Sequence, residues 1–225
     1  MPHEIHSPVY EALRLFLGEQ WDIYRLLLRV CRKKPGRAVV HGLRTSLRRL
    51  GAGLAVLGEL VELKGVAQLR KEFKAELHSL RDLRDSQVQQ KAMKGQNDSK
   101  MIAEFRASLK KRCRRQQTCA RKRLKRAKAA KLGYCMLKIE EVLVACGQDA
   151  RRSHNAASQL EHMLEREFKA LQACVQHAKA SDPASMHATR IQFKKYRYLW
   201  QVAEPSIPLP LAVARRMKTV QTQLG

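Results

Sequence analysis

Apolar residues recur every three or four positions along almost the whole chain, which is the spacing of one face of an α-helix. No run of alternating β-branched residues is long enough to predict a strand. Proline, glycine and N-cap residues divide the pattern into segments, and the sequence therefore predicts an all-α fold. The expected helices cover about residues 9–32, 38–63, 66–94, 99–131, 134–180 with a break at 146–149, 183–203 and 211–225.

One helical stretch occurs twice. The segment "VHGLRTSLRRL" at 40–50 recurs within "MHATRIQFKKYRYLW" at 186–200, at a constant offset of 146 residues. The charged residues that correspond are His41, Arg44, Arg48 and Arg49 with His187, Arg190, Lys194 and Lys195. The apolar residues that correspond are Leu47, Leu50, Leu54 and Leu57 with Phe193, Tyr196, Trp200 and Ala203.

The spacing places the two sets on opposite faces of each helix. At about 100° per residue, the His and the basic residues three and seven positions later lie within about 60° of one another. Arg197 and Tyr198 return to the same face. Arg offers a rigid set of donors to phosphate oxygens, Lys a point charge, and His becomes cationic when an anion raises its pKa. The repeat favours a shared anion site over a solvated basic stripe with an incidental histidine.

The net charge indicates the same class of ligand. Lys and Arg total 45 against 20 acidic residues, so the formal charge is +25, and a polyanion would relieve the repulsion. In the tract 106–131, 13 of 26 residues are Lys or Arg and none is acidic. This tract either follows a phosphate chain or is a solvated helix face, and the sequence leaves both open. Further candidate ligands are Arg84, Arg121 and Lys125.

The repeated pattern H-x-x-R-x-x-x-[RK]-[RK], with "LRDLRDSQV" at 80–88 after the first copy, resembles the CHAD family, the conserved histidine α-helical domain. The resemblance covers nearly the whole chain, 1–225, as a single domain. It implies two four-helix bundles related by a pseudo-twofold axis, whose basic helices line a cavity that binds inorganic polyphosphate. The first repeat would span 1–146, including a basic helix at 106–131, and the second 147–225.

Carried over by position, the resemblance assigns polyphosphate binding to His41, Arg44, Arg48 and Arg49 in the first half and to His187, Arg190, Lys194, Lys195, Arg197 and Tyr198 in the second. Gly51 stands where the family usually has a further basic residue, so the first half is expected to hold its ligand less firmly. The chain stops before the counterparts of Arg84 and Asp85, which implies a second bundle without its last helices. Arg84 and Asp85 are expected to form a pair that orients Arg84.

An enzyme is the less favoured class. A histidine phosphohydrolase would need its histidine at the end of a strand, and none is predicted. A metal-dependent phosphatase would need clustered His and Asp ligands, whereas His41 and His187 have arginine neighbours, which disfavour a cation. We therefore expect no catalytic residue, no metal ion and no cofactor.

A nucleic-acid-binding protein is the main alternative, because a chain of this charge binds DNA or RNA at low salt. Only 5% of the residues are aromatic, and no basic-region zipper or recognition helix is evident. A third hypothesis is a scaffold on polyphosphate granules. The six cysteines lack CxxC spacing, the N-terminus does not resemble a signal peptide, and no apolar run approaches a membrane span. We therefore expect a cytoplasmic protein with reduced thiols; the sequence indicates no oligomeric state.

Overall fold

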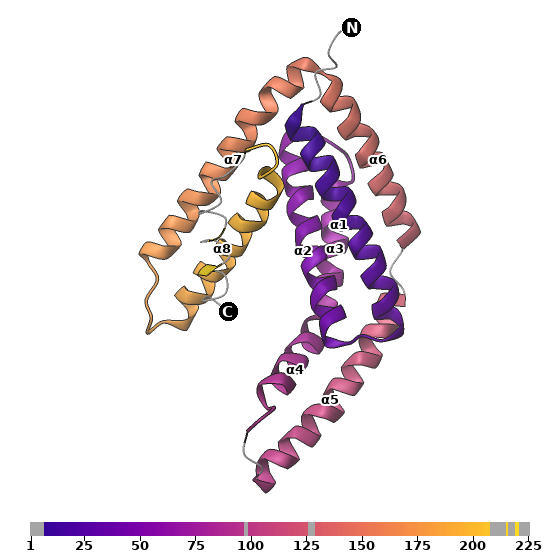
Figure 1. Ribbon diagram of the computed structural model, residues 1–225, viewed down its shortest axis with the longest axis vertical. Helices are drawn as coiled ribbons and strands as arrows, with labels where there is room; N and C mark the ends of the chain where they lie inside the picture. The colour runs from indigo at the N-terminus through magenta and orange to yellow at the C-terminus, as the bar shows by residue number, and fades with distance from the viewer. Residues whose placement is uncertain (1–6, 97–98, 126–128, 208–214, 216–218, 221–225) are drawn as a thin grey trace. The chain divides into compact units, whose positions relative to one another are not determined.

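The computed structural model describes residues 7–96, 99–125, 129–207, 215 and 219–220. These residues hold eight helices and no strand, which confirms the all-α prediction (Figure 1). The expected helix at 211–225 lies largely outside them. The helices are α1 (Pro8–Lys33), α2 (Arg37–Leu60), α3 (Val66–Ser79), α4 (Arg81–Ala92), α5 (Lys100–Lys125), α6 (Ala129–Gln148), α7 (Ala150–Gln176) and α8 (Pro183–Ala203).

Three helices begin at side-chain caps. The side-chain oxygens of Ser99, Asp149 and Asp182 accept hydrogen bonds from main-chain N–H groups in the first turns of α5, α7 and α8, at 3.3, 3.1 and 2.9 Å. Each bond satisfies a donor that has no partner within its own helix. These caps explain why the polar signals at 97–99, 146–149 and 181–183 predict helix starts correctly.

α3 and α4 are two helices where the sequence predicts one over 66–94. The backbone leaves the helical conformation at Leu80, with φ −97° and ψ 1°, and the Leu80 side chain is fully buried. The guanidinium of Arg44 in α2 donates a hydrogen bond to the carbonyl of Leu77 in the last turn of α3. The prediction of one helix was wrong because this break depends on packing and on a contact with α2, and no Pro or Gly marks it.

The basic tract also departs from expectation. The expected single helix over 106–131 is shared between α5 and the first turn of α6, and residues 126–128 lie outside the described residues. Gly133 falls in the gap between the expected helices at 99–131 and 134–180. In the structure it lies within α6, where a Cβ atom would be 3.7 Å from Cζ2 of Trp21. A single glycine within a helix is tolerated, so its presence alone did not locate the end.

The chain forms two compact units. One, here the α7–α8 unit, consists of Met1–Gly18, Ala52–Val66 and Met136–Gly225. The other, here the α4–α5 unit, consists of Glu19–Gly51 and Ala67–Cys135. The helices α1, α2 and α6 cross these boundaries, so each of them has one part in one unit and the rest in the other. The boundary expected between two repeats at residue 146 stays a prediction.

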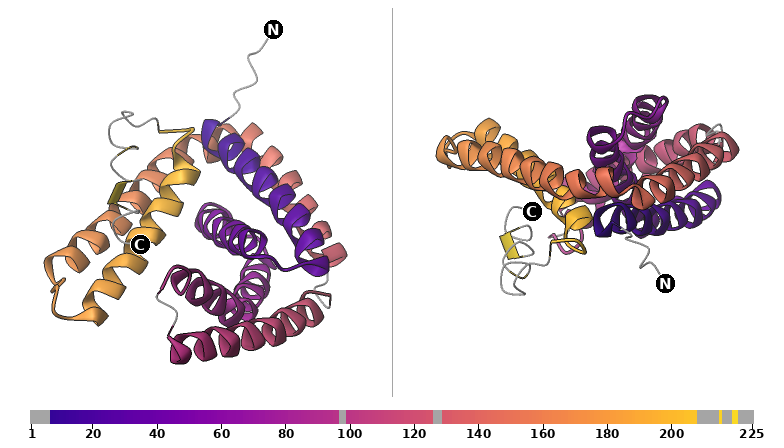
Figure 2. Two further views of the ribbon diagram at one scale, coloured as in Figure 1. Left: turned by 60° about the horizontal axis from the view of Figure 1, so that its bottom comes forward. Right: turned by 90° about the horizontal axis from the view of Figure 1, so that it is seen from above.

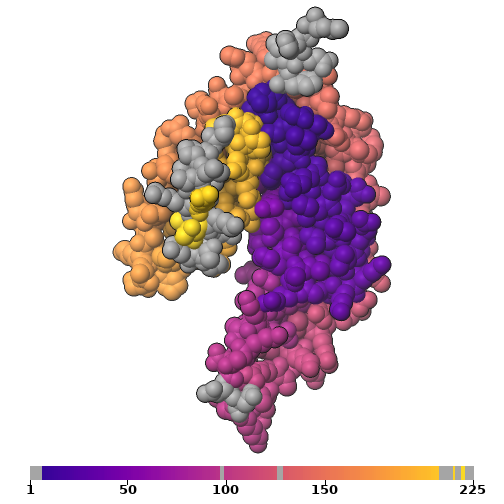
Figure 3. Space-filling view, in the orientation of Figure 1, coloured from indigo at the N-terminus to yellow at the C-terminus, as the bar shows by residue number. Residues whose placement is uncertain are grey.

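An aromatic cluster lies in the core of the α4–α5 unit. The ring of Tyr24 lies 5.2 Å from that of Trp21 and 5.5 Å from that of Phe73, measured between centroids. The Tyr24 hydroxyl donates to a carboxylate oxygen of Glu76 at 2.8 Å, which satisfies the polar end of a fully buried ring. α4 and α5 lie side by side, and their side chains meet along the pair (Figures 1, 2 and 3).

The α7–α8 unit is built on a second antiparallel helix pair, α7 with α8 (Figures 1 and 2). Arg166 of α7 donates two hydrogen bonds to the carboxylate of Glu59 in α2, at 2.8 and 3.0 Å. In the same unit α2 passes so close to α1 that a Cβ atom on Gly53 would lie 2.6 Å from Cδ2 of Leu17.

Among the residues with described positions, no helix is long and apolar enough to cross a membrane.

Candidate functional site

The first motif helix, α2, buries its apolar side chains and presents its basic ones. His41 is exposed, and Arg44 and Arg48 are half-buried. The opposite face confirms the predicted packing surface, since each of the following residues is at most 2% exposed: Leu47, Leu50, Leu54 and Leu57. Burial of this face fixes the rotation of α2, which places the basic side chains together on the other side.

α4 adds two guanidinium groups to this basic face. The charges of Arg81 and Arg84 act on Arg44, and the charge of Arg84 acts on His41. Asp85 is the one carboxylate, within the described residues, among the groups that shift the pKa values of Arg44 and Arg84. We call the following six groups the cationic cluster: Arg37, His41, Arg44 and Arg48 of α2, and Arg81 and Arg84 of α4.

Three members of the cationic cluster have lowered pKa values. Burial and then the charge of Arg48 lower the pKa of Arg44 to about 10, so its guanidinium stays charged at neutral pH. Burial and then Arg37 lower the pKa of Arg84. Partial burial, followed by the charge of Arg84, also lowers the pKa of His41, which favours the neutral imidazole. Burial and neighbouring positive charges therefore disfavour the cationic forms of these side chains, and a bound anion would stabilise them.

Asp85 pairs with a different arginine from the one expected from the sequence. Asp85 Oδ2 lies 4.0 Å from Nε of Arg81, one turn earlier on α4, in place of the expected pair with Arg84. Residues four apart share a helix face, whereas adjacent residues point about 100° apart. Asp85 still acts on Arg84 through its charge, because it raises the pKa that burial and Arg37 lower.

Three other predicted ligands of the first half lie away from the cationic cluster. Arg49 Nη1 lies 3.5 Å from Oε1 of Gln20, a buried residue of α1. Arg121 Nε donates to the carbonyl of Arg32 at the end of α1, at 3.3 Å. Lys125 is exposed at the end of α5. Binding of a ligand by these three side chains stays a prediction.

The second motif helix, α8, repeats the apolar face with aromatic residues. Phe193 and Trp200 are each 8% exposed, and Ala203 is fully buried. Tyr196 is half-buried, with its ring centroid 5.6 Å from that of Phe168 and 6.4 Å from that of Trp200. Rings in this tilted arrangement pack favourably, so these side chains serve the core of the α7–α8 unit.

Lys195 is held by α7. Its Nζ lies 2.7 Å from Oε2 of Glu167, a residue that is 6% exposed. Burial pushes the pKa of Glu167 upward, but hydrogen bonds from Lys195 and Gln192 outweigh it and the pKa lies below its usual value. A buried carboxylate needs such partners. Lys195 therefore has a structural role that its position in the motif does not reveal.

The remaining residues of the second motif differ in their surroundings. His187 is exposed, and Arg190 and Lys194 are half-buried. Tyr198 is only 8% exposed, and the guanidinium carbon of Arg197 lies 4.7 Å from the centroid of its ring. Such a contact is a cation–π interaction. Tyr198 thus lies beneath Arg197 and contributes to packing.

The two motifs belong to different units, the first to the α4–α5 unit and the second to the α7–α8 unit. Their convergence on one cleft stays a prediction. Beside the first motif, the structure adds Arg37 of α2 and Arg81 of α4, which were not among the ligands predicted from the sequence. A signal for both exists, because Arg37 lies four residues before His41 and Arg81 three before Arg84, on shared helix faces. No group of three metal-binding side chains occurs among the residues that the structure describes.

Comparisons with known proteins identify the family and the fold of the chain. The sequence profile of the CHAD domain matches residues 24–225. No curated protein matches the chain. The crystal structure of the CHAD domain from the plant Ricinus communis is similar, with a TM-score of 0.77 and 18% sequence identity over 100% of this chain and 76% of that chain. At this identity the likeness shows a shared fold. The profile of the CHAD domain spans most of this chain, so the chain belongs to the CHAD domain family.

Proposed function

We propose that this chain binds inorganic polyphosphate and that the cationic cluster of the α4–α5 unit contacts the phosphates. The observation that carries the proposal is the concentration of positive charge around His41. Three groups of the cluster have lowered pKa values, and only Asp85 opposes them within the described part of the chain. A polyanion neutralises such a cluster and gains affinity by releasing its own counterions.

The donors of the cationic cluster suit phosphate oxygens. Guanidinium groups present rigid pairs of N–H donors, and a protonated imidazole adds two more. Polyphosphate is a flexible chain that carries a charge on every unit, so it can adapt to guanidinium groups on two helices. In this proposal the exposed His187 and the half-buried Arg190 and Lys194 contact the same ligand as a second surface.

The proposed activity is binding without catalysis. His41 is surrounded by the charges of Arg84, Arg48 and Arg44, which suit an anion and disfavour a metal ion. A scaffold on polyphosphate granules would use the same surface. Imaging of the tagged chain in cells with and without granules tests that role. A scaffold should lie on the granules where they are present.

Nucleic-acid binding is the alternative that a specific surface favours. α5 presents a run of exposed basic side chains, which a duplex could contact along its backbone. They are Lys110, Lys111, Arg114, Arg115, Lys122 and Arg123.

A salt-matched competition separates the two candidates. The chain is saturated with a labelled DNA duplex, and long-chain polyphosphate or unlabelled duplex is added at equal phosphate concentration. Polyphosphate is expected to displace the label at the lower concentration across the whole salt series. Equal or better displacement by the unlabelled duplex would instead support nucleic acid as the ligand.

A further inference from the structure

A pocket of about 350 Å³ lies between α4 and α5, beside the cationic cluster. Its volume falls in the lower part of the range for small-molecule sites, about 300–1,000 Å³. Arg37 belongs to both the pocket and the cluster, and the other lining residues lie outside the cluster. The polar residues that line the pocket include Arg37, Lys91, Lys94, Gln87 and Gln90.

The charges around the pocket are all positive. Arg37, Lys91 and Lys94 are exposed cations from α2, α4 and the end of α4, and none of the lining residues is acidic. Exposed cations that converge without a carboxylate favour an anionic ligand. Three such groups can contact one or two phosphate groups.

The wall of the pocket also holds a buried acceptor that a fully ionised phosphate cannot satisfy. Gln87 is 4% exposed, and its Nε2 donates to the carbonyl of Pro35 at 3.0 Å. That bond fixes the amide, because the reverse orientation would place two acceptor oxygens against each other. Oε1 of Gln87 is buried and has no hydrogen-bond partner. A buried acceptor of this kind requires a donor from a ligand or water.

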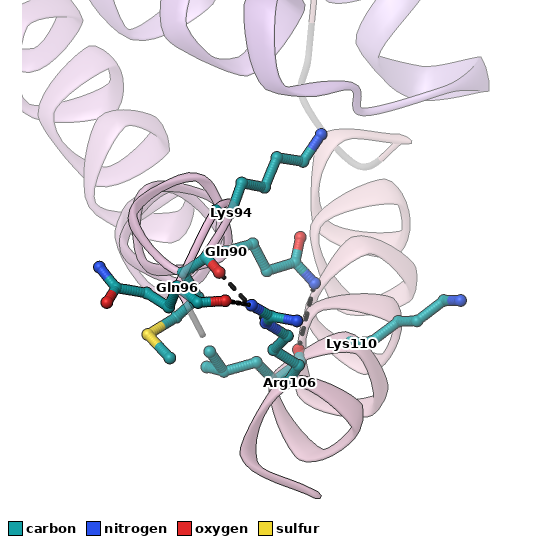
Figure 4. A pocket seen from close by; sticks show the side chains of 8 residues that line it. Gln90, Lys94, Gln96, Arg106 and Lys110 are labelled. Atoms are coloured by element: carbon teal, nitrogen blue, oxygen red, sulfur yellow. Dashed lines mark hydrogen bonds between the residues drawn. The ribbon is translucent and has the colours of Figure 1, made fainter. Parts of the chain in front are cut away.

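Gln90 offers a second acceptor, on a half-buried side chain. Its Nε2 donates to the carbonyl of Leu109 in α5 at 3.4 Å. Figure 4 shows its amide oxygen turned away from that contact, on the side of Lys94. A fully ionised phosphate group has no donor, so the two glutamine oxygens suit hydroxyl groups.

The neighbouring larger pocket does not share these properties. It has a volume of about 540 Å³, and its arginine, Arg106, is occupied by the main-chain carbonyls of Met93 and Gln96, at 3.1 and 2.6 Å. Lys110 points away from it (Figure 4). Its third cation, Lys94, also lines the smaller pocket, so the larger pocket has no convergent set of cations of its own.

We infer that the pocket lined by Arg37, Lys91 and Lys94 is a separate binding site for a small phosphorylated sugar or polyol. The three cations hold the phosphate groups, and the oxygens of Gln87 and Gln90 accept hydrogen bonds from hydroxyl groups. This site does not depend on polyphosphate binding at the cationic cluster.

Two probes of similar charge test the preference for hydroxyl groups. Fructose 1,6-bisphosphate and pyrophosphate are titrated calorimetrically into the full chain. The sugar bisphosphate is expected to bind about tenfold more tightly, because its several hydroxyls can donate to the oxygens of Gln87 and Gln90. Equal binding, or tighter binding of pyrophosphate, would overturn the inference.

Variants locate the binding. Lys91→Glu with Lys94→Glu is expected to weaken sugar bisphosphate binding at least about tenfold, through the loss of charge-assisted contacts. The control is Lys100→Glu with Lys111→Glu, which makes the same change in net charge at exposed positions of α5 outside the pocket, and should weaken it less than about threefold. Similar losses in both double variants would show diffuse attraction and no site.

The acceptors are tested separately. Gln90→Met removes one acceptor and leaves the contact between Gln87 and Pro35 intact, so the variant should fold. It is expected to reduce the preference for the sugar bisphosphate without weakening pyrophosphate, whereas an unchanged preference contradicts the role of the amides. In Arg48→Glu with Arg84→Glu, sugar bisphosphate binding should persist while polyphosphate binding falls. Parallel loss of both ligands would mean that the pocket is not a separate site.

Discussion

The guanidinium of Arg44 donates a hydrogen bond to the main-chain carbonyl of Leu77, with Nη1 and the oxygen 2.8 Å apart. This bond lies at the end of α3, immediately before Leu80 and the start of α4. α4 carries Arg81 and Arg84, so a residue of the first motif contacts the helix end that directly precedes these two guanidinium groups of the cationic cluster. The same side chain thus contributes to the fold and to the proposed site.

Replacing Arg44 with Met is expected to lower the free energy of unfolding by about 1.5–3 kcal/mol, because a half-buried carbonyl loses a charged donor. Urea denaturation followed by circular dichroism measures the change. The matched control, Arg48→Met, removes the same charge one turn along α2 and should cost less than about 1 kcal/mol. Equal stability of the two variants would show that the contact with Leu77 has no structural weight.

Binding of polyphosphate is expected to take up protons through His41. Burial and the neighbouring arginines lower its pKa in the free protein, and a bound polyanion raises it. The added affinity is therefore fully present below the free pKa and is lost as pH rises through the bound pKa. Affinity should change about tenfold for each unit of pKa between the two states.

Calorimetry in two buffers with different ionisation enthalpies measures this proton uptake. The control, His41→Asn, keeps a polar side chain without a titrating imidazole, and the end groups of polyphosphate titrate equally with both proteins. The uptake should therefore be smaller for His41→Asn. The same uptake in both proteins would place the titrating group elsewhere.

If the two motifs contact one ligand, the stoichiometry of binding should reveal it. Arg190→Glu with Lys194→Glu in α8 is expected to weaken binding of short-chain polyphosphate while leaving one chain bound per protein. Two independent sites would instead give two bound chains in the unmodified protein and one in this variant. Calorimetric titration distinguishes these outcomes, and the second would contradict a shared site.

Lys195 is expected to act on stability more than on binding. Lys195→Met leaves the buried Glu167 without its lysine and should cost about 1–2 kcal/mol, a reduced value because the Lys195 side chain is 61% exposed. The loss should be present above the unfolded pKa of Glu167 and disappear as pH falls through its lowered folded pKa. Lys179→Met, at an exposed position before α8, is the control. Equal unfolding midpoints for the two variants at neutral pH would contradict the role assigned to the ion pair.

Much of the fold follows from local sequence, because caps such as Asp149 and Asp182 act within one turn of themselves. The break at Leu80 does not, because Arg44 reaches it from another helix. The faces of the motif helices are predictable from helical spacing alone. The partners of single side chains are not predictable in this way. Glu167 holds Lys195, and the charges of Arg81 and Arg84 act on Arg44 only because segments about 40 residues apart pack near each other.

The most direct test of the central claim is fluorescence titration of polyphosphate with Arg48→Glu plus Arg84→Glu, which spares the contact between Arg44 and Leu77. The control, Lys111→Glu plus Arg115→Glu, makes the same charge change on the exposed face of α5. Both proteins should keep native helicity. We expect at least about tenfold weaker binding for the cluster variant and less than about threefold for the control. Equal losses would contradict this expectation by showing diffuse attraction, and a larger loss in the α5 control would identify the basic tract as the binding surface.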